Sequence, residues 1–397
     1  MSPSPEAIAT AAVMFVALAA YALFGGADFG GGIWDLLAGG TRRGAAAREL
    51  IDESITPVWE ANHVWLIFVL VLLWTGFPPA FAAIMTALFI PLSLSLLGIF
   101  LRGAGFAFRH TAERLRMQQL TGVMFAAASL ITPFFLGTVI GAVATGQVPA
   151  HPAGNMLSAW TSLTAVLTGA LFVAACAYIS AVFLVLEARL RRHQDLVRYF
   201  LLRATGAGVL TGALAAITFA ELSRSAPHVF AGLTGRALPL VAISVAAGLA
   251  VLGMIWLRWY PGLRVTAAIA VAAVVWGWGV AQYPDLLPGA LSLAAGSAPP
   301  AALLAELVIA GAAALIVGPA FGLLYWLQQR GMLAGAESAT GLRRAARLAP
   351  GPPGGQAPAA PAPAASRLTT ALVLAVVAIK AIKDLISPAR RRSGQRV

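Results

Sequence analysis

The chain has 397 residues, of which 59% are hydrophobic and only 11% are charged. A soluble domain carries about 25% charged residues, so this chain cannot cover a water-exposed surface and must be solvated largely by lipid. The net charge of +12 does not indicate a nucleic-acid partner, because the arginines form short runs between apolar stretches and no continuous basic face. We interpret them as anchors at the membrane surface.

Cysteine usage argues against a disulfide-linked or cysteine-metal protein, and the N-terminal residues argue against a cleavable signal peptide. Cys176 is the only cysteine and lies in an apolar run, which excludes a disulfide framework or a cysteine-ligated metal site within the chain. The first apolar run follows Pro3, Pro5 and Glu6 instead of basic residues, and it is too long for a cleavable signal peptide. We therefore expect it to be the first membrane span.

Nine stretches of the sequence provide the roughly 20 mostly apolar residues that a membrane-spanning helix needs. They are too continuously apolar for alternating barrel strands, and helices satisfy their own backbone hydrogen bonds in lipid. The sequence predicts an all-α polytopic membrane protein with about nine transmembrane helices, near residues 8–32, 58–77, 81–101, 120–143, 160–186, 200–222, 238–257, 265–283 and 303–327.

The basic residues orient these spans. Connections after even-numbered spans carry only Arg224 and Arg236. Connections after odd-numbered spans carry Arg42, Arg43, Arg48, Arg102, Arg109, Arg114, Arg116, Arg189, Arg191, Arg192, Arg198, Arg258, Arg264 and Arg330. The positive-inside rule then makes the odd-numbered connections cytoplasmic and places the N-terminus outside. Nine alternating spans leave the C-terminal region in the cytoplasm.

The composition changes after the last span. We expect residues 1–334 to form the transmembrane domain and residues 335–366, which are rich in proline, alanine and glycine, to form a flexible cytoplasmic linker. Residues 367–397 combine a short apolar stretch with a basic tail, which favours a helix lying in the cytoplasmic interface. A tenth span is the alternative, although it would carry the basic tail outward.

Asp28 is an ionisable residue within an apolar stretch. A central acid costs about 2.5–3.5 kcal/mol on insertion scales, so it usually has a function or a partner. Asp28 lies about 20 residues into the first span, roughly 30 Å from its outer end and near the cytoplasmic boundary. Five glycines flank it within residues 25–32, and they weaken the helix while permitting close approach of a neighbour. The structural alternative is a frayed helix end with a hydrated carboxylate.

A second acid, Glu60, lies in the sequence PVWEANHVW at residues 57–65. Pro57 fits the first turn of the second span, and the helix dipole favours a glutamate at this end, which is a purely structural explanation. However, Asp28 and Glu60 are both on the cytoplasmic side, and acids in a low-dielectric setting can exchange protons near neutral pH. The two acids together suggest a proton uptake route.

His63, beside Glu60, could be a haem ligand. A haem held between membrane spans usually has two axial ligands that project from them. The other histidines fall in or near predicted loops, at His110, His151, His193 and His228. We therefore expect no haem within this chain alone and interpret His63 as a hydrogen-bonding residue. The sequence contains no phosphate-binding loop, metal-ligand cluster or catalytic nucleophile arrangement.

Read in order, these segments resemble subunit II of cytochrome bd-type oxidases. That family has a glycine-flanked acidic motif ending the first helix, here GADFG at 26–30. A second motif, with proline and tryptophan before an acid and an asparagine, opens the second helix, here PVWEANHVWL at 57–66. Further matches are FP at 77–78, LRGAGFAFR at 101–109, residues 133–141 and GWGVAQYP at 277–284. The resemblance covers most of residues 7–330.

The resemblance implies two four-helix bundles and one peripheral helix, in a subunit of the bacterial cell membrane that binds no haem itself. Its partner would be subunit I, which carries two b-type haems and haem d, oxidises quinol and reduces dioxygen to water. Some members also hold a quinone in this subunit, and a small accessory subunit is a further expected partner. The acids matching Asp28 and Glu60 are associated with proton delivery. The supporting residues would be Trp59, Asn62, His63 and Arg102.

The chain departs from the family pattern at several acidic positions. Gly25 and Ala107 stand where the family often has acids, and Glu60 and Ala61 stand where it more often has aspartate and glycine. The smaller set of carboxylates leaves two alternatives open. One is a proton-coupled secondary transporter, which predicts broken helices and midplane polar groups in both halves. The other is a purely structural anchor subunit whose acids no longer conduct protons.

Overall fold

The computed structural model describes residues 2–39, 44–55, 59–109, 115–150 and 157–329. The predicted linker at 335–366 and the basic segment at 367–397 lie outside these residues, as do His110 and His151. The described elements are α1 (Pro5–Leu36), α2 (Ala45–Ile55), α3 (Trp59–Gly76), α4 (Pro78–Ala87), α5 (Phe89–Arg109), α6 (Leu115–Ala144), α7 (Ser158–Thr161), α8 (Leu163–Leu190), α9 (Gln194–Ser225), α10 (Pro227–Thr234), α11 (Leu238–Trp256), α12 (Leu263–Gln282), β1 (Asp285–Leu287), β2 (Leu291–Ser292), α13 (Leu293–Gly296) and α14 (Pro300–Gln329).

Seven of the described helices are long and apolar enough to cross a membrane: α1, α6, α8, α9, α11, α12 and α14. Helices α3 and α4 meet the same test as a pair, bent by 119°, and would make an eighth span, whereas α5 is a shorter apolar helix over its described part. The all-α polytopic class is thereby confirmed, with the small β1–β2 hairpin as an addition. The count of nine spans stays a prediction.

The predicted third span, residues 81–101, is wrong in its first part. Helix α3 ends at Gly76, Phe77 caps a new helix, and α4 continues only to Ala87 before α5 starts at Phe89. Pro78 and Pro79 explain the break between α3 and α4, because proline has no backbone N–H to continue α3 but fits the first turn of the next helix. The break that divides the predicted third span lies at Leu88, the C-cap of α4. The apolar residues before Phe89 therefore belong to a bent segment and not to the span that carries Arg102.

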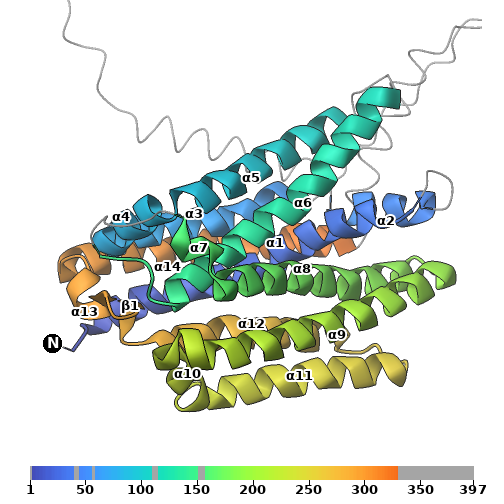
Figure 1. The fold of residues 1–397 in the computed structure, drawn as a ribbon. Coiled ribbons are helices and arrows are strands. Elements are labelled where there is room, and N and C mark those ends of the chain that lie inside the picture. The colour runs from blue at the N-terminus through green and yellow to red at the C-terminus, as the bar shows by residue number, and fades with distance from the viewer. Residues whose placement is uncertain (1, 40–43, 56–58, 110–114, 151–156, 330–397) are drawn as a thin grey trace, which may run out of the picture. The chain divides into compact units, whose positions relative to one another are not determined.

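Helix α1 packs against helices from both parts of the chain, namely α3, α6, α8, α12 and α14 (Figure 1). Helices α8, α9, α11 and α12 form one group, in which α8 contacts α9 and α12, and α11 contacts the same two helices. Helix α5 packs along α6, and α14 contacts α1 and α3. The contacts of α8 with α1 and α6 join the two groups. The side chains of α1 from Ala17 to Asp35 are accordingly buried or half-buried, although Val16 is 53% exposed.

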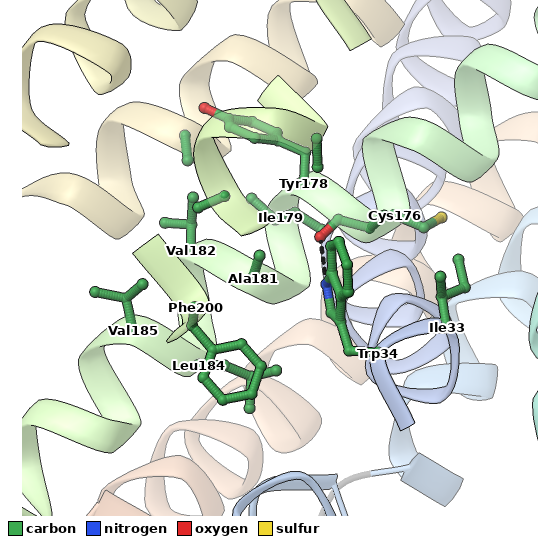
Figure 2. Packing of buried hydrophobic residues seen from close by; sticks show 14 of the residues in the cluster. Ile33, Trp34, Cys176, Tyr178, Ile179, Ala181, Val182, Leu184, Val185 and Phe200 are labelled. Carbon is green, nitrogen blue, oxygen red and sulfur yellow. Dashed lines mark hydrogen bonds between the residues drawn. The ribbon is translucent and has the colours of Figure 1, made fainter. Parts of the chain in front are cut away.

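The contact between α1 and α8 forms the main apolar core. Figure 2 shows Trp34 of α1 beside α8, with its indole N–H directed at a backbone oxygen. Trp34 Nε1 donates to the carbonyl of Ala177 at 2.8 Å. Ile179, Val182 and Val185 of α8 are fully buried around it. The indole hydrogen bond ties the last turns of α1 to α8, so α1 stays helical beyond its glycine-rich segment.

At the other end of α1, Phe15 packs on the motif GWGVAQYP of α12. Its ring centroid lies 5.6 Å from that of Trp278, and Gly279 leaves the space that the ring occupies. The side-chain amide of Gln282 donates to the carbonyl of Leu286 at 2.5 Å, which holds the β1–β2 hairpin against the end of α12. This part of the motif is explained by packing.

Candidate functional site

The structure brings Asp28 of α1 and Arg102 of α5 into direct contact. Arg102 Nη2 lies 2.6 Å from Asp28 Oδ1 and donates to the backbone carbonyl of Asp28 at 2.9 Å. Asp28 is 3% exposed and Arg102 is 1% exposed. An ion pair removed from water persists only when additional hydrogen bonds satisfy both partners. The alternative of a frayed helix end open to bulk water is therefore wrong, because Asp28 is buried and α1 continues to Leu36.

Further groups from α1 and α6 hold the guanidinium of Arg102. Its Nη1 donates to the hydroxyl of Ser129, which in turn donates to the carbonyl of Phe125 at 2.7 Å. The guanidinium carbon lies 4.3 Å from the ring centroid of Phe125 and 5.2 Å from that of Phe29, within the range of cation–π attraction. Three helices thus fix Arg102 beside Asp28.

The glycines of the acidic motif create room for this site. A Cβ atom at Gly30 would lie 1.9 Å from the carbonyl oxygen of Cys176, so α8 could not approach. A Cβ atom at Gly32 would lie 2.0 Å from Ser129 Oγ and 3.0 Å from Arg102 Nη1. Since α1 continues to Leu36, the glycines permit close packing and do not end the helix.

Several polar atoms near the ion pair have no hydrogen-bond partner among the described residues. They are Asp28 Oδ2, the Tyr21 hydroxyl, Asn62 Oδ1 and both ring nitrogens of His63. The ring of Phe29 lies 6.2 Å from Tyr21 and 6.1 Å from His63, centroid to centroid. The side chains of Tyr21 and His63 also interact electrostatically with Asp28 and Arg102. Because buried polar groups normally have partners, this grouping marks a polar site between α1 and α3.

Tyr21 and Ser129 were not predicted as site residues. Tyr21 is buried and lies seven residues before Asp28, on the same face of the helix. A Cβ atom at Gly25 would meet the Tyr21 ring at 2.9 Å, so the tyrosine fills the space at a position where the family often has an acid. Helical spacing could have identified Tyr21. Nothing distinguishes Ser129 from other hydroxyl residues of apolar helices in the sequence.

The predicted residues of the second motif all lie at the beginning of α3. Trp59 and Glu60 are its first two residues, and their side chains lie outside what the structure describes. Asn62 is 2% exposed, and the His63 ring centroid lies 6.1 Å from that of Tyr21. The structure therefore places Asn62 and His63 in the packed contact of α3 with α1, whereas Glu60 is located only by its backbone.

The described residues do not offer a haem two axial ligands. The His63 ring lies beside the aromatic rings of Tyr21 and Phe29, with its centroid 6.1 Å from each of theirs. His193 is the residue that precedes α9, and His228 is exposed in α10, 3.6 Å from Asp285. These three histidines therefore lie at separate places in the fold: in α3, before α9 and in α10.

Glu306 in α14 is a half-buried acid that the motifs did not reveal. Its Oε1 accepts a hydrogen bond from the hydroxyl of Thr75 in α3. Its Oε2 is shielded and has no partner among the described residues, and it lies where a side chain at Gly76 would begin. An acid within the last predicted span indicates by itself a functional group or a residue with a polar partner. Its contacts tie α14 to α3.

The fold and site define an integral membrane protein of the all-α polytopic class, with a buried acid–base pair between two of its helices. A model of the family described as cytochrome bd terminal oxidase subunit II matches residues 7–328. This chain therefore belongs to that family, as the motifs at 26–30 and 57–66 predicted.

Known relatives agree with this assignment. The chain is 29% identical to cytochrome bd ubiquinol oxidase subunit 2 of Bacillus subtilis (strain 168) over 136 residues, which are 34% of this chain and 38% of the relative. It is 28% identical to cytochrome bd-I ubiquinol oxidase subunit 2 of Escherichia coli (strain K12) over 131 residues, 33% and 34% of the two chains. The matched part thus spans less than two fifths of these relatives.

A solved structure shares the fold. A chain in the structure of bd oxidase from Geobacillus thermodenitrificans matches with a TM-score of 0.67 and 22% sequence identity. The match covers 82% of this chain and 98% of that one. At this identity the similarity concerns the fold, which thus extends well beyond the part aligned with the relatives above.

Proposed function

We propose that this chain is the non-haem subunit of a cytochrome bd-type quinol:oxygen oxidoreductase in the bacterial cell membrane. It binds and stabilises subunit I, which carries the b-type haems and haem d, and it helps to deliver cytoplasmic protons for the reduction of dioxygen to water. Family membership and the names of the relatives support the assignment to the complex. Family membership also disfavours a secondary transporter.

The observation that carries the proton-delivery part is the polar site between α1 and α3. Asp28 uses only one carboxylate oxygen for Arg102, and its other oxygen is buried without a protein partner among the described residues. The Tyr21 hydroxyl and the His63 ring nitrogens are likewise buried without a hydrogen-bond partner among the described residues. Buried polar atoms of this kind are satisfied by ordered water. Water held by these groups can pass protons along α1.

The Asp28–Arg102 pair has a positioning role in this proposal. Arg102 keeps the carboxylate in one orientation through three acceptors, Asp28 Oδ1, the Asp28 carbonyl and the Ser129 hydroxyl. A charge fixed in this way orients nearby water dipoles without reorganisation during transfer. Glu60, at the start of α3, receives the proton from the cytoplasm, and Asn62 and His63 lie along the same helix towards Asp28, with Trp59 beside Glu60.

The first experiment replaces Glu60 by glutamine in the assembled complex, which keeps the side-chain size and removes the exchangeable proton. Oxygen consumption and proton uptake are measured in proteoliposomes, and the haem spectrum reports assembly. We expect both rates to fall at least about tenfold, since positioned proton transfer contributes about 10²–10⁴-fold. Asp35→Asn is the control, because Asp35 is an acid of α1 outside the polar site. It is ion-paired with Arg48 at 3.4 Å. Unchanged rates in Glu60→Gln would refute the role of Glu60.

A purely structural function is the second candidate, and the ion pair itself favours it because each charge satisfies the other. Asp28→Asn alone leaves a buried unpaired arginine, which costs about 3–5 kcal/mol. The double variant Asp28→Asn with Arg102→Gln removes both charges. If the double variant assembles and respires at the normal rate, the pair is structural. If it assembles with normal haem content but takes up protons slowly, the pair belongs to the proton route.

A further inference from the structure

A cleft separate from the ion-pair site lies between α1, α6, α8 and α9. It measures about 680 Å³, and the side chains around it are almost all apolar. Small residues of α8 and α9 form one wall and larger apolar residues of α6 form the other; among them are Ala174, Gly206, Leu130 and Phe134. The volume falls within the range of small-molecule sites, about 300–1,000 Å³.

Arg203 of α9 lies at one end of this cleft and has no carboxylate partner among the described residues. Its Nη1 donates only to the carbonyl of Tyr199, at 3.3 Å, and its Nε has no hydrogen-bond partner there. The hydroxyl of Tyr199 is also buried and has no hydrogen-bond partner among the described residues. By contrast, Arg102 and Arg264 each bind an acid of another helix at 2.6 Å. A cation within a span needs an anion or a route to water.

The guanidinium of Arg203 points back towards the start of α9. Its carbon lies 3.3 Å from the ring centroid of Tyr199, one turn earlier in the helix, and 5.7 Å from the ring of Trp34. Trp34 is near the end of α1, and its own N–H already binds Ala177 (Figure 2). An arginine directed to a helix end in this way extends to the level of the lipid headgroups.

The rest of the cleft runs away from Arg203 into the apolar part of the helices. From Arg203 to Leu214, the last lining residue of α9, the helix rises about 16 Å. A cation at one end and an elongated apolar space behind it match an amphiphile with a negatively charged head and a hydrocarbon tail. Basic pockets between membrane helices on the cytoplasmic side bind anionic lipid headgroups.

We propose that this cleft binds an anionic phospholipid of the cytoplasmic leaflet, with its phosphodiester at Arg203 and one acyl chain lying between α6, α8 and α9. The arginine supplies N–H donors to the phosphate oxygens, and the apolar walls bury the chain. This site shares no side chain with the Asp28–Arg102 pair. It does not depend on the proton-delivery proposal.

The test uses the complete complex in nanodiscs with equal amounts of phosphatidylglycerol and phosphatidylcholine. After mild extraction, mass spectrometry measures the two lipids retained per complex. We expect retention of phosphatidylglycerol to exceed that of phosphatidylcholine about fivefold, as one arginine near the headgroups provides. Arg203→Gln should bring the ratio close to one. Arg198→Gln, which removes an exposed charge from the same helix, should leave the ratio unchanged.

A second pair of variants tests the acyl-chain part. Gly206 lines the cleft, and a side chain there meets open space, so Gly206→Leu fills the cleft without a clash. Gly212 is equally open but does not line the cleft, and Gly212→Leu is the control. Gly206→Leu alone should lower the retained phosphatidylglycerol. An even lipid ratio in the unaltered complex, equal effects of the Arg203 and Arg198 variants, or retention of a quinone instead of phospholipid would overturn the proposal.

Discussion

Arg102 makes more specific contacts than a positive charge alone requires. It donates to two oxygen atoms of Asp28 and to the hydroxyl of Ser129, and its flat face lies over the ring of Phe125. A lysine has the same charge but cannot reach these acceptors in one fixed geometry. The identity of the side chain at this position therefore affects stability as well as charge.

We expect Arg102→Lys to lower the stability of the complex by about 1.5–3 kcal/mol, the size of a lost charge-assisted hydrogen bond. Thermal unfolding of the purified complex, followed by haem absorbance, measures this change. Arg198→Lys is the control, because Arg198 is exposed on α9. Equal melting temperatures for the two variants would show that Arg102 acts only as a charge.

The glycines near Asp28 differ sharply in what they permit. At Gly30 an added methyl group would overlap the backbone of α8, whereas at Gly26 its nearest neighbour, Cys176 Sγ, would be at 3.5 Å, an ordinary contact. Gly30→Ala should therefore separate α1 from α8 and cost about 1–3 kcal/mol or more, as overpacking does. Gly26→Ala should be neutral or slightly stabilising, since alanine favours helix. Yield and melting temperature of the two variants test this contrast.

Among its described residues, α14 has few polar contacts with other helices. The hydrogen bond between Thr75 and Glu306 joins it to α3. Thr75→Val keeps the side-chain shape but removes this bond from the half-buried acid, which costs about 0.5–1.5 kcal/mol, the net contribution of one ordinary hydrogen bond. Thr211→Val is matched, because the hydroxyl of Thr211 binds only its own helix. We expect Thr75→Val alone to lower the melting temperature of the complex, and the same loss in both variants would contradict this role.

The sequence predicted the long apolar helices well, because an apolar run of this length has no other stable form in lipid. It did not predict α2, a helix in the connection after the first span, because α2 mixes charged and apolar residues and has no long apolar run. Two adjacent prolines at 78–79 signal the break before α4, but they do not mark the second break, at Leu88, that divides the predicted third span. Helices that consist of one long apolar run are therefore predictable from the sequence, whereas amphipathic helices such as α2 and bent segments such as α4 are not.

The site was predictable only in part for a similar reason. Asp28 is costly in an apolar helix, and this cost made it visible. Its pairing with Arg102, 74 residues away in the sequence, depends on the packing of α1, α5 and α6. The contributions of Tyr21 and Ser129 depend on the same packing. Single-residue chemistry identified the acid, and tertiary structure supplied its surroundings.

At the scale of the whole molecule, the predicted orientation rests on the arginine distribution. Ion pairs join parts of the chain that the positive-inside rule assigns to the cytoplasmic side: Arg48 with Asp35, Arg191 with Glu53, and Arg264 with Glu187. These pairs connect the end of α1, α2, the end of α8 and the beginning of α12. They support one common face for the odd-numbered connections.

Chemical labelling can test this orientation. Gln194 and Thr234 are exposed residues in connections expected on the cytoplasmic and outer sides respectively. A membrane-impermeant maleimide applied to intact cells should label Thr234→Cys but not Gln194→Cys, and both after the membrane is broken. The native Cys176 is buried and gives a low background. The reverse pattern would place the N-terminus and the C-terminal region on the opposite sides.

The separation of Asp28 and Arg102 along the chain also constrains how the protein is made. Helix α1 leaves the ribosome before α5, so Asp28 is inserted 74 residues ahead of its partner. Its carboxylate then costs at most about 2.5–3.5 kcal/mol, the figure for an acid at a helix centre, and the apolar residues of α1 offset this cost at about 0.3–0.6 kcal/mol each. The charge pair closes only when α5 and α6 have followed. The nascent first helix is therefore held in the bilayer by its own apolar residues until α5 and α6 arrive.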